Sequence, residues 1–171
     1  SLNGNNIVHD LSGYNESVDL LVTDSIKIHW KENNRFEILD NTIIHSMQPA
    51  TKIINACKET NEITLECWIK PSLKEFMYNS SIISLSQDSE NIGISLMQSD
   101  FGLSEYGNYK YLTGLSTRST ESNGKPYLTG EEDEPHTLHH VVYSRDNLGQ
   151  EKMYLNSKLI ANSVKPLGFD N

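Results

Sequence analysis

Residues 136–160 read HTLHHVVYSRDNLGQEKMYLNSKLI, and this stretch decides the fold. Apolar and polar residues alternate along it, which is typical of β-strands. The turn-forming segment RDNLGQ separates two such runs. Asn156 and Ser157 then occupy the place of a tight hairpin loop, with serine where glycine is more usual. The residues from 138 to 162 are therefore predicted to form a three-stranded antiparallel meander.

The adjacent residues His139 and His140 raise the question of a metal site. Successive side chains of a strand point to opposite faces, so neighbouring histidines of a strand cannot bind the same ion. His136 and His140 have helical spacing, but Pro135 and the valine pair that follows His140 argue against a helix. We expect these histidines to form structural hydrogen bonds at the faces of a sheet.

Working outward from this stretch, short strands recur along the chain. The segment EITLECWIKPS alternates between residues expected to face a core and residues expected to face away. The first set is Ile63, Leu65, Cys67 and Ile69, and the second is Thr64, Glu66, Trp68 and Lys70. SIISLSQ and NIGISLMQ are predicted to form two more strands around a polar turn.

The N-terminal third has a different pattern of apolar and polar residues. Two short apolar runs within residues 18–30, separated by TDS, are predicted to form a hairpin. Pro49 can begin a helix, and the apolar residues that follow it fall on one helical face, so a short helix is expected near residues 50–59.

Composition limits the partners of the chain. With 171 residues it has the size of one domain, and residues 1–171 are expected to form a single one. The formal net charge of −9 argues against nucleic acid and anionic membrane surfaces. The sequence contains no run of about 18 apolar residues, so membrane insertion is not predicted. Cys57 and Cys67 are too few for a disulfide scaffold, and the sequence leaves open whether they pair.

Several segments in this order resemble a known family. VHDLSGYNESVDLLV, ITLECWIKPS, NIGISLMQ and HHVVYSRDNLGQEKMYLNSKLI resemble the laminin-G-like, concanavalin A-like jelly-roll domains of bacterial exported proteins. The resemblance covers nearly the whole chain, including PATKIINACK and STRSTESNGKPYL. It implies an all-β fold, a two-sheet antiparallel jelly-roll sandwich with one short helix, in an extracellular or cell-envelope protein.

One departure from the family concerns the C-terminus. Family members continue past a segment like LGFDN into further strands that close the sandwich, whereas this chain ends there. We expect the domain to be truncated at its C-terminus and excised from a larger protein; the alternative is that another segment supplies the closing strands. An unclosed sheet edge would favour self-association between edge strands.

The sequence favours a non-catalytic role. Glycoside hydrolases of this fold need two carboxylates about 5–9.5 Å apart. The acidic cluster EEDE at 131–134 is interpreted as a solvated turn, and Glu66 stands alone on its strand. There is no G-x-S-x-G motif, and neither cysteine is expected to have a basic partner that lowers the pKa of its thiol. We expect the protein not to be an enzyme.

Carbohydrate is the ligand class that the sequence favours. Sugar sites need exposed aromatic faces with hydrogen-bonding side chains beside them. The candidate ligand-binding residues are Trp68, Tyr106, Tyr109, Tyr111, Arg118, Asn123 and Tyr127. The alternative for the tyrosines is that they cap a sandwich edge, and for Trp68 that a loop covers it.

These observations leave two functions open. The first is a carbohydrate-binding or adhesion module. The second is a structural or protein–protein interaction module without a small-molecule ligand. The resemblance also implies calcium, for which Asp10 and Asn15 are the candidate ligands because hard oxygen donors suit this ion.

Overall fold

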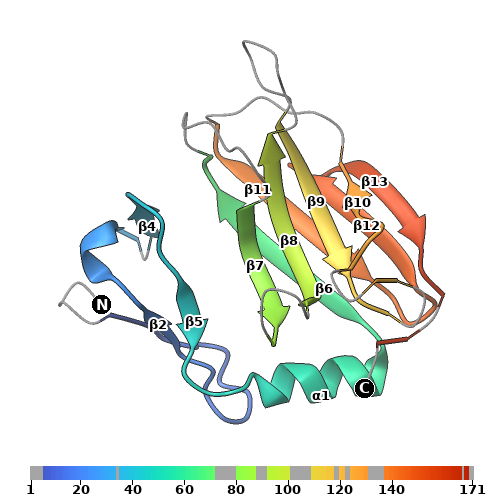
Figure 1. The fold of residues 1–171 in the computed structure, drawn as a ribbon, viewed down its shortest axis with the longest axis horizontal. Coiled ribbons are helices and arrows are strands. Elements are labelled where there is room, and N and C mark those ends of the chain that lie inside the picture. Colours follow the sequence, from blue (N-terminus) through green and yellow to red (C-terminus); the bar gives the residue numbers. More distant parts are fainter. Residues whose placement is uncertain are drawn as a thin grey trace. The chain divides into compact units, whose positions relative to one another are not determined.

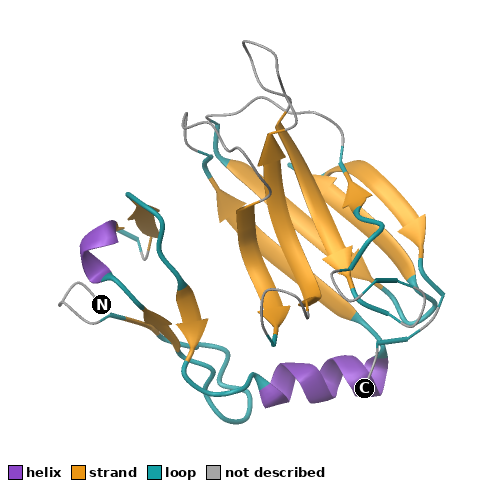
Figure 2. Cartoon of the chain, in the orientation of Figure 1, coloured by secondary structure: helices purple, strands orange, loops and turns teal. Residues whose placement is uncertain are grey.

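The structure is a computed structural model in which β-strands predominate (Figure 2). It describes residues 6–33, 35–71, 80–87, 92–100, 109–117, 120–121, 124–130, 137–166 and 168–169. All paired strands are antiparallel, and one α-helix, α1 (Thr51–Thr60), accompanies them. The predicted all-β class with one short helix is thereby confirmed. The chain divides into two compact units, Ser1–Ile54 and Asn55–Asn171.

Two four-stranded sheets form the larger unit, and Figure 1 shows them stacked. Sheet I has the order β10-β9-β8-β7, and sheet II has the order β13-β12-β11-β6. The strands of sheet I are β7 (Ser80–Ser86), β8 (Ile92–Asp100), β9 (Tyr109–Leu115) and β10 (Leu128–Thr129). Those of sheet II are β6 (Ile63–Ile69), β11 (His139–Arg145), β12 (Gln150–Leu155) and β13 (Lys158–Val164).

A single hydrophobic core lies between these sheets. Strand alternation selects its members: every second residue of β11 and β12 is buried. The core residues are Ile94, Leu96, Tyr111, Leu115 and Leu128 from sheet I, and Val141, Tyr143, Met153 and Leu155 from sheet II. The apolar residues predicted to face inward on β6 pack against them. The larger unit is therefore sandwich-like.

The interior also contains a charged side chain, Glu151, which is fully buried. The Tyr143 hydroxyl donates to its carboxylate at 2.8 Å, the Ser163 hydroxyl donates at 2.6 Å, and the Lys165 ammonium lies 3.6 Å away. Burial raises the pKa of Tyr143, so the phenol keeps its donor proton. Burial lowers the pKa of Lys165. The carboxylate is thus satisfied by three partners, as a buried charge must be.

The predicted meander is confirmed by strands β11, β12 and β13 and by their turns. The Asp146 carboxylate accepts the amides of Leu148 and Gln150 at 3.0 and 2.9 Å and so shapes the first turn. In the second turn, Asn156 and Ser157 both have left-handed backbone angles, with φ of 48° and 71°. This is the conformation that a two-residue hairpin turn requires.

The smaller unit contains a sheet and a separate hairpin. The sheet has the order β1-β2-β5, formed by β1 (Ile7–Val8), β2 (Leu20–Val22) and β5 (Ile44–Ser46). The hairpin joins β3 (Ile28–Lys31) and β4 (Arg35–Ile38). The predicted hairpin at 18–30 is therefore wrong. Between its two runs, the Asp24 carboxylate caps a 3-10 helix, η1 (Ser25–Lys27), instead of supporting a tight turn.

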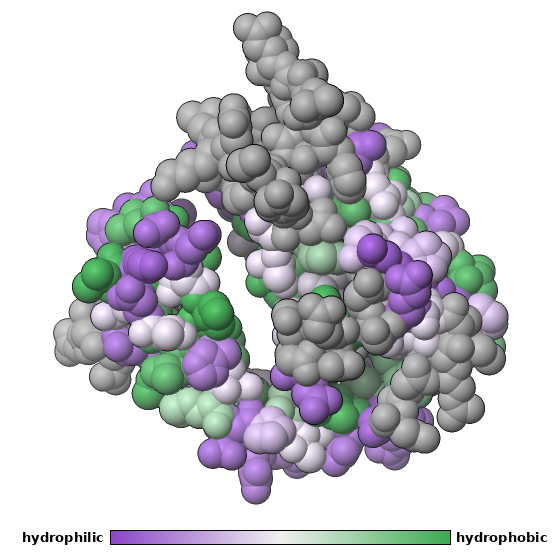
Figure 3. Space-filling view, in the orientation of Figure 1, coloured by the Kyte–Doolittle hydropathy of each residue, from purple (hydrophilic) through white to green (hydrophobic). Residues whose placement is uncertain are grey.

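The smaller unit buries few apolar side chains. Among its described residues, the buried hydrophobic ones are Val22, Ile28 and Ala50. Its exposed large hydrophobic residues are Leu11, Tyr14, Ile26, Phe36, Ile38, Leu39, Ile43, Met47 and Ile53. Figure 3 shows hydrophobic residues of this unit, in green, interspersed with hydrophilic ones on the face drawn. In the part of the chain that the structure describes, no helix has the length and apolar character needed to cross a bilayer.

Candidate functional site

An exposed indole stacked on an imidazole forms the candidate site. Trp68 of β6 and His140 of β11 lie directly opposite each other in the strand register. Their ring centroids are 4.5 Å apart and the ring planes differ by 17°, while Trp68 remains 67% exposed. One ring face of the indole is covered by His140, and the other points away from β11. The prediction of an outward-facing Trp68 is confirmed.

The backbone explains why these rings meet. The His140 N–H donates to the Asn156 side-chain oxygen at 2.9 Å, and the His140 carbonyl accepts the Asn156 amide at 2.9 Å. Both groups of His140 therefore point away from β6, so His140 and Trp68 form a non-hydrogen-bonded pair. Side chains of such pairs lie closest together across an antiparallel ladder, which brings the two rings into contact.

Glu66 completes the site and holds the imidazole in place. Its carboxylate Oε1 lies 2.7 Å from His140 Nε2. The Glu66 side chain is 57% exposed, so this contact contributes little to folding, but it orients the ring that supports Trp68. We call Glu66, Trp68 and His140 the Trp68 platform. It offers an apolar ring face and, beside it, a carboxylate whose exposed surface can accept hydrogen bonds.

His139 points the opposite way, into the core. It is 1% exposed, its Nδ1 lies 2.8 Å from the Tyr111 hydroxyl, and its Nε2 lies 2.7 Å from the Thr137 hydroxyl. The prediction that the two histidines take opposite faces and form structural hydrogen bonds is confirmed. Across the described ranges, no three His, Cys, Asp or Glu side chains gather in a way that could hold a metal ion.

One of the predicted tyrosines, Tyr111, does not fit a ligand site. Tyr111 is 1% exposed, with its ring packed edge-on against His139, so it cannot present a face to a ligand. Because β9 is an inner strand of sheet I, alternation puts this tyrosine in the core. Tyr127 is half-buried, with the Lys125 ammonium 6.0 Å from its ring centroid.

Three of the other predicted ligand-binding residues, and the side chain of a fourth, lie outside the part of the chain that the structure describes. Tyr106, Arg118 and Asn123 lie outside the described residues. Tyr109 begins β9, and its side chain also lies outside them.

His140 and Glu66 were not predicted as site residues. Sequence alternation identified Glu66 and Trp68 as neighbours on one strand face. The pairing of β6 with β11 joins residues 74 positions apart, as in the contact between Glu66 and His140. Nothing in the local sequence specifies this partner.

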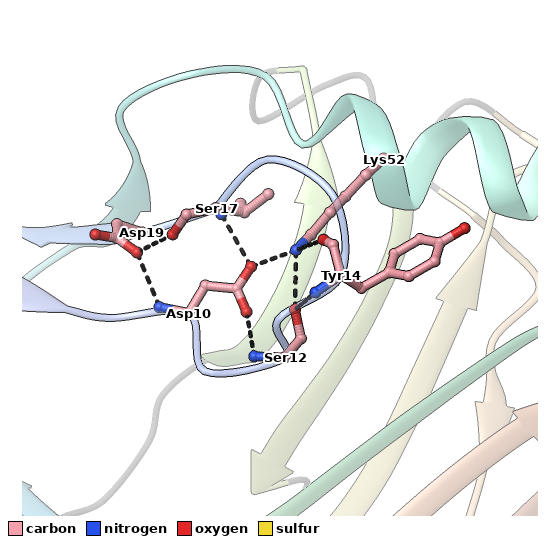
Figure 4. A network of polar contacts seen from close by, with 7 residues as sticks. Asp10, Ser12, Tyr14, Ser17, Asp19 and Lys52 are labelled. Carbon is pink, nitrogen blue, oxygen red and sulfur yellow. Dashed lines mark hydrogen bonds and ion pairs between the residues drawn. The ribbon is translucent and has the colours of Figure 1, made fainter.

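The candidate calcium ligand Asp10 already has a cation beside it (Figure 4). Its carboxylate pairs with the Lys52 ammonium, which also donates to the Ser12 hydroxyl at 3.0 Å and to the Tyr14 carbonyl at 2.8 Å. The amides of Ser12 and Val18 donate to the same carboxylate at 2.8 and 3.0 Å. These contacts hold the pKa of Asp10 well below its usual range.

This arrangement does not fit a calcium ion at Asp10. The ammonium lies where three oxygen atoms converge, and a divalent ion placed there would be repelled by it. The second candidate, Asn15, has a left-handed backbone with φ of 53°, which suits a turn. The loop that begins at Asp10 is closed by the Lys52 ammonium, which binds Asp10, Ser12 and Tyr14.

The two cysteines are free thiols. Cys57 is buried in α1, and Cys67 is half-buried on the inner face of β6. Burial raises the pKa of both thiols, and for Cys67 burial together with the charge of Glu66 raises it to about 11. Both groups are therefore protonated and weakly nucleophilic near neutral pH.

Comparison of the chain with models of known protein families found no match, and searches of curated proteins and of solved structures found none either.

Proposed function

We propose that the chain is a non-catalytic carbohydrate-binding or adhesion module. The observation that carries the proposal is the Trp68 platform, an indole 67% exposed whose orientation is fixed by stacking on His140. The proposal includes the laminin-G-like jelly-roll topology and an extracellular or cell-envelope location in a bacterial protein. Both rest on the resemblance of the sequence.

A pyranose ring matches this platform chemically. The apolar face of the sugar would lie on the free face of the indole, where stacking is stabilised by dispersion and by removal of both surfaces from water. The Glu66 carboxylate would accept a hydrogen bond from a sugar hydroxyl. Because His140 already restricts the indole, little side-chain entropy would be lost on binding.

Binding is favoured over hydrolysis by the positions of the carboxylates. Hydrolysis at the platform would need a second carboxylate on the same face of sheet II. Within the described strands of that sheet, the other acidic residue is Glu151, which is fully buried in the core. Glu66 can therefore act as a hydrogen-bond acceptor, and the pair of acid groups that glycosidases use is not assembled from these strands.

A structural or protein–protein interaction module is the second candidate. It is favoured by the position of β6 at the edge of sheet II, because an edge strand can pair with another chain.

The test is binding of the full chain to an array of immobilised oligosaccharides, with calcium and with a chelator. We expect retention on a subset of glycans, with a loss of about tenfold or more in affinity for Trp68→Ala, because an exposed aromatic anchor dominates such sites. Leu148→Ala is the matched control, since this residue is 69% exposed in a turn away from the platform. Absence of binding to every glycan, or equal binding by Trp68→Ala, would overturn the proposal.

A further inference from the structure

Strand β6 forms one edge of sheet II. β6 is the terminal strand in the order β13-β12-β11-β6, and it pairs with β11 alone among the described strands. Its inner-face residues Cys67 and Ile69 are only half-buried, although they pack against the core. Both the backbone and the apolar side of this strand are thus incompletely covered.

The backbone contacts of His140 show which residues of β6 direct their N–H and C=O groups toward the open edge. Since the N–H and C=O of His140 bond to Asn156, the opposite residue Trp68 also turns its N–H and C=O away from β11. Alternation extends this to Glu66 and, beyond the strand end, to Lys70. The outer-face residues therefore present their backbone donors and acceptors to the open edge.

We propose that this edge binds a second copy of the chain, with the two β6 strands antiparallel about a two-fold axis at Trp68. Trp68 then lies opposite Trp68 of the second copy, and Glu66 lies opposite Lys70 of the second copy, twice by symmetry. All of these are hydrogen-bonded positions. Pro71, which has no N–H, falls in a non-hydrogen-bonded position opposite Leu65, where no donor is required.

Charge selects this register over its neighbours. A two-fold axis at Glu66 would place the two Glu66 carboxylates opposite each other, and like charges in directly opposed positions are destabilising. An axis at Cys67 would place Glu66 opposite Trp68 and leave both charges without a partner. Centring on Trp68 forms two Glu–Lys pairs on the outer face. On the inner face it places Cys67 opposite Ile69, which covers two half-buried apolar residues in each copy.

The inference goes beyond the proposed function and does not depend on it. It does use the same part of Trp68: the ring face left free by His140 would meet the indole of the second copy. A ligand stacked on Trp68 and a second copy of the chain therefore compete.

Charge reversal tests the pairing in the full chain. Analytical ultracentrifugation of the wild type should show a monomer–dimer equilibrium at micromolar to millimolar concentration. Glu66→Lys and Lys70→Glu should each raise the dissociation constant by about tenfold or more, because each places like charges opposite each other twice. The double variant E66K/K70E should restore the wild-type value. An equimolar mixture of the two single variants should form a heterodimer, since each strand then meets its complement.

Two controls separate pairing from misfolding. Lys70→Glu leaves the contact between Glu66 and His140 intact, so its effect cannot come from a disturbed platform. Hydrogen exchange should slow at the amides of Glu66 and Trp68 as wild-type concentration rises, and should be independent of concentration in each single variant. The inference is overturned if the wild type stays monomeric throughout, or if single variants associate as tightly as the wild type.

Discussion

Asp10 shapes one loop of the smaller unit through a single carboxylate. It receives the amides of Ser12 and Val18 and the ammonium of Lys52, while its own amide donates to the Asp19 carboxylate at 2.9 Å. Asp19 in turn accepts from the Ser17 hydroxyl and lies 2.8 Å from His9 Nδ1. Two carboxylates thus order one turn of the chain, at the residues for which the resemblance implies calcium.

The pH dependence of this loop follows from the direction of its pKa shifts. Hydrogen bonds lower the pKa of Asp19 to about 2, and Asp10 is lowered further, chiefly by Lys52. A lowered pKa means that the ionised form stabilises the folded loop. This stabilisation is fully present above the ordinary carboxyl pKa near 4 and is lost as the pH falls through about 2.

We expect NMR shifts of the backbone amides to follow these titrations. The Asp10 amide should report Asp19 with a midpoint near pH 2, and the Ser12 amide should report Asp10 at a lower pH. In Lys52→Ala the Ser12 transition should move up toward pH 4, because its largest cause is removed. An unchanged Ser12 midpoint would contradict the assignment.

At the scale of elements, the alternation of apolar and polar residues predicted which face of a strand each side chain takes, but it did not predict which strands pair. The inward and outward residues of β6 and the three strands of the meander followed from a period of two along each strand, which is a local property. The false hairpin at 18–30 combined two real strands that have other partners. The pairing of strands depends on residues far apart in the sequence, and the pairing of β6 with β11 is what stacks Trp68 on His140.

The turn between β12 and β13 allows a stability prediction. Ser157 has a φ of 71°, a conformation that costs a residue with a side chain about 1 kcal/mol. Ser157→Gly should therefore raise the free energy of unfolding by about that amount in urea denaturation. Asn156→Gly is the control: it relieves a φ of 48° but removes the side-chain oxygen that accepts the His140 amide. An equal gain from both variants would show that this hydrogen bond contributes nothing.

At the scale of the whole molecule, apolar burial is unevenly divided. All residues of the main core lie between positions 94 and 155, within the larger unit. The described residues of the smaller unit leave more large hydrophobic side chains exposed than buried. Composition and length predicted one domain, and neither property reveals how a core is distributed along a chain. Within the region at 101–127, the sequence did not show that β9 is an inner strand of sheet I, whose alternation places Tyr111 in the core.

This distribution predicts that the larger unit folds on its own. A fragment of residues 49–171, which keeps α1 whole, should unfold cooperatively and retain a near-ultraviolet circular dichroism signal from its packed tyrosines. Burial of the shared core supplies the free energy. The same fragment carrying Leu96→Asp should lose both properties, because it buries an unpaired charge. A fragment without fixed tertiary signal would show that residues before position 49 are required.

The two consecutive imidazoles have a consequence for the alignment of β11. The His139 ring has its partners on the core side of sheet II, and the His140 ring has its partners on the outer face. If the strand slipped by a single residue, the ring bonded to Tyr111 would emerge into water while the neighbour of Trp68 entered the apolar interior. Both changes raise the free energy of the misaligned strand, so each imidazole separately disfavours the shifted register.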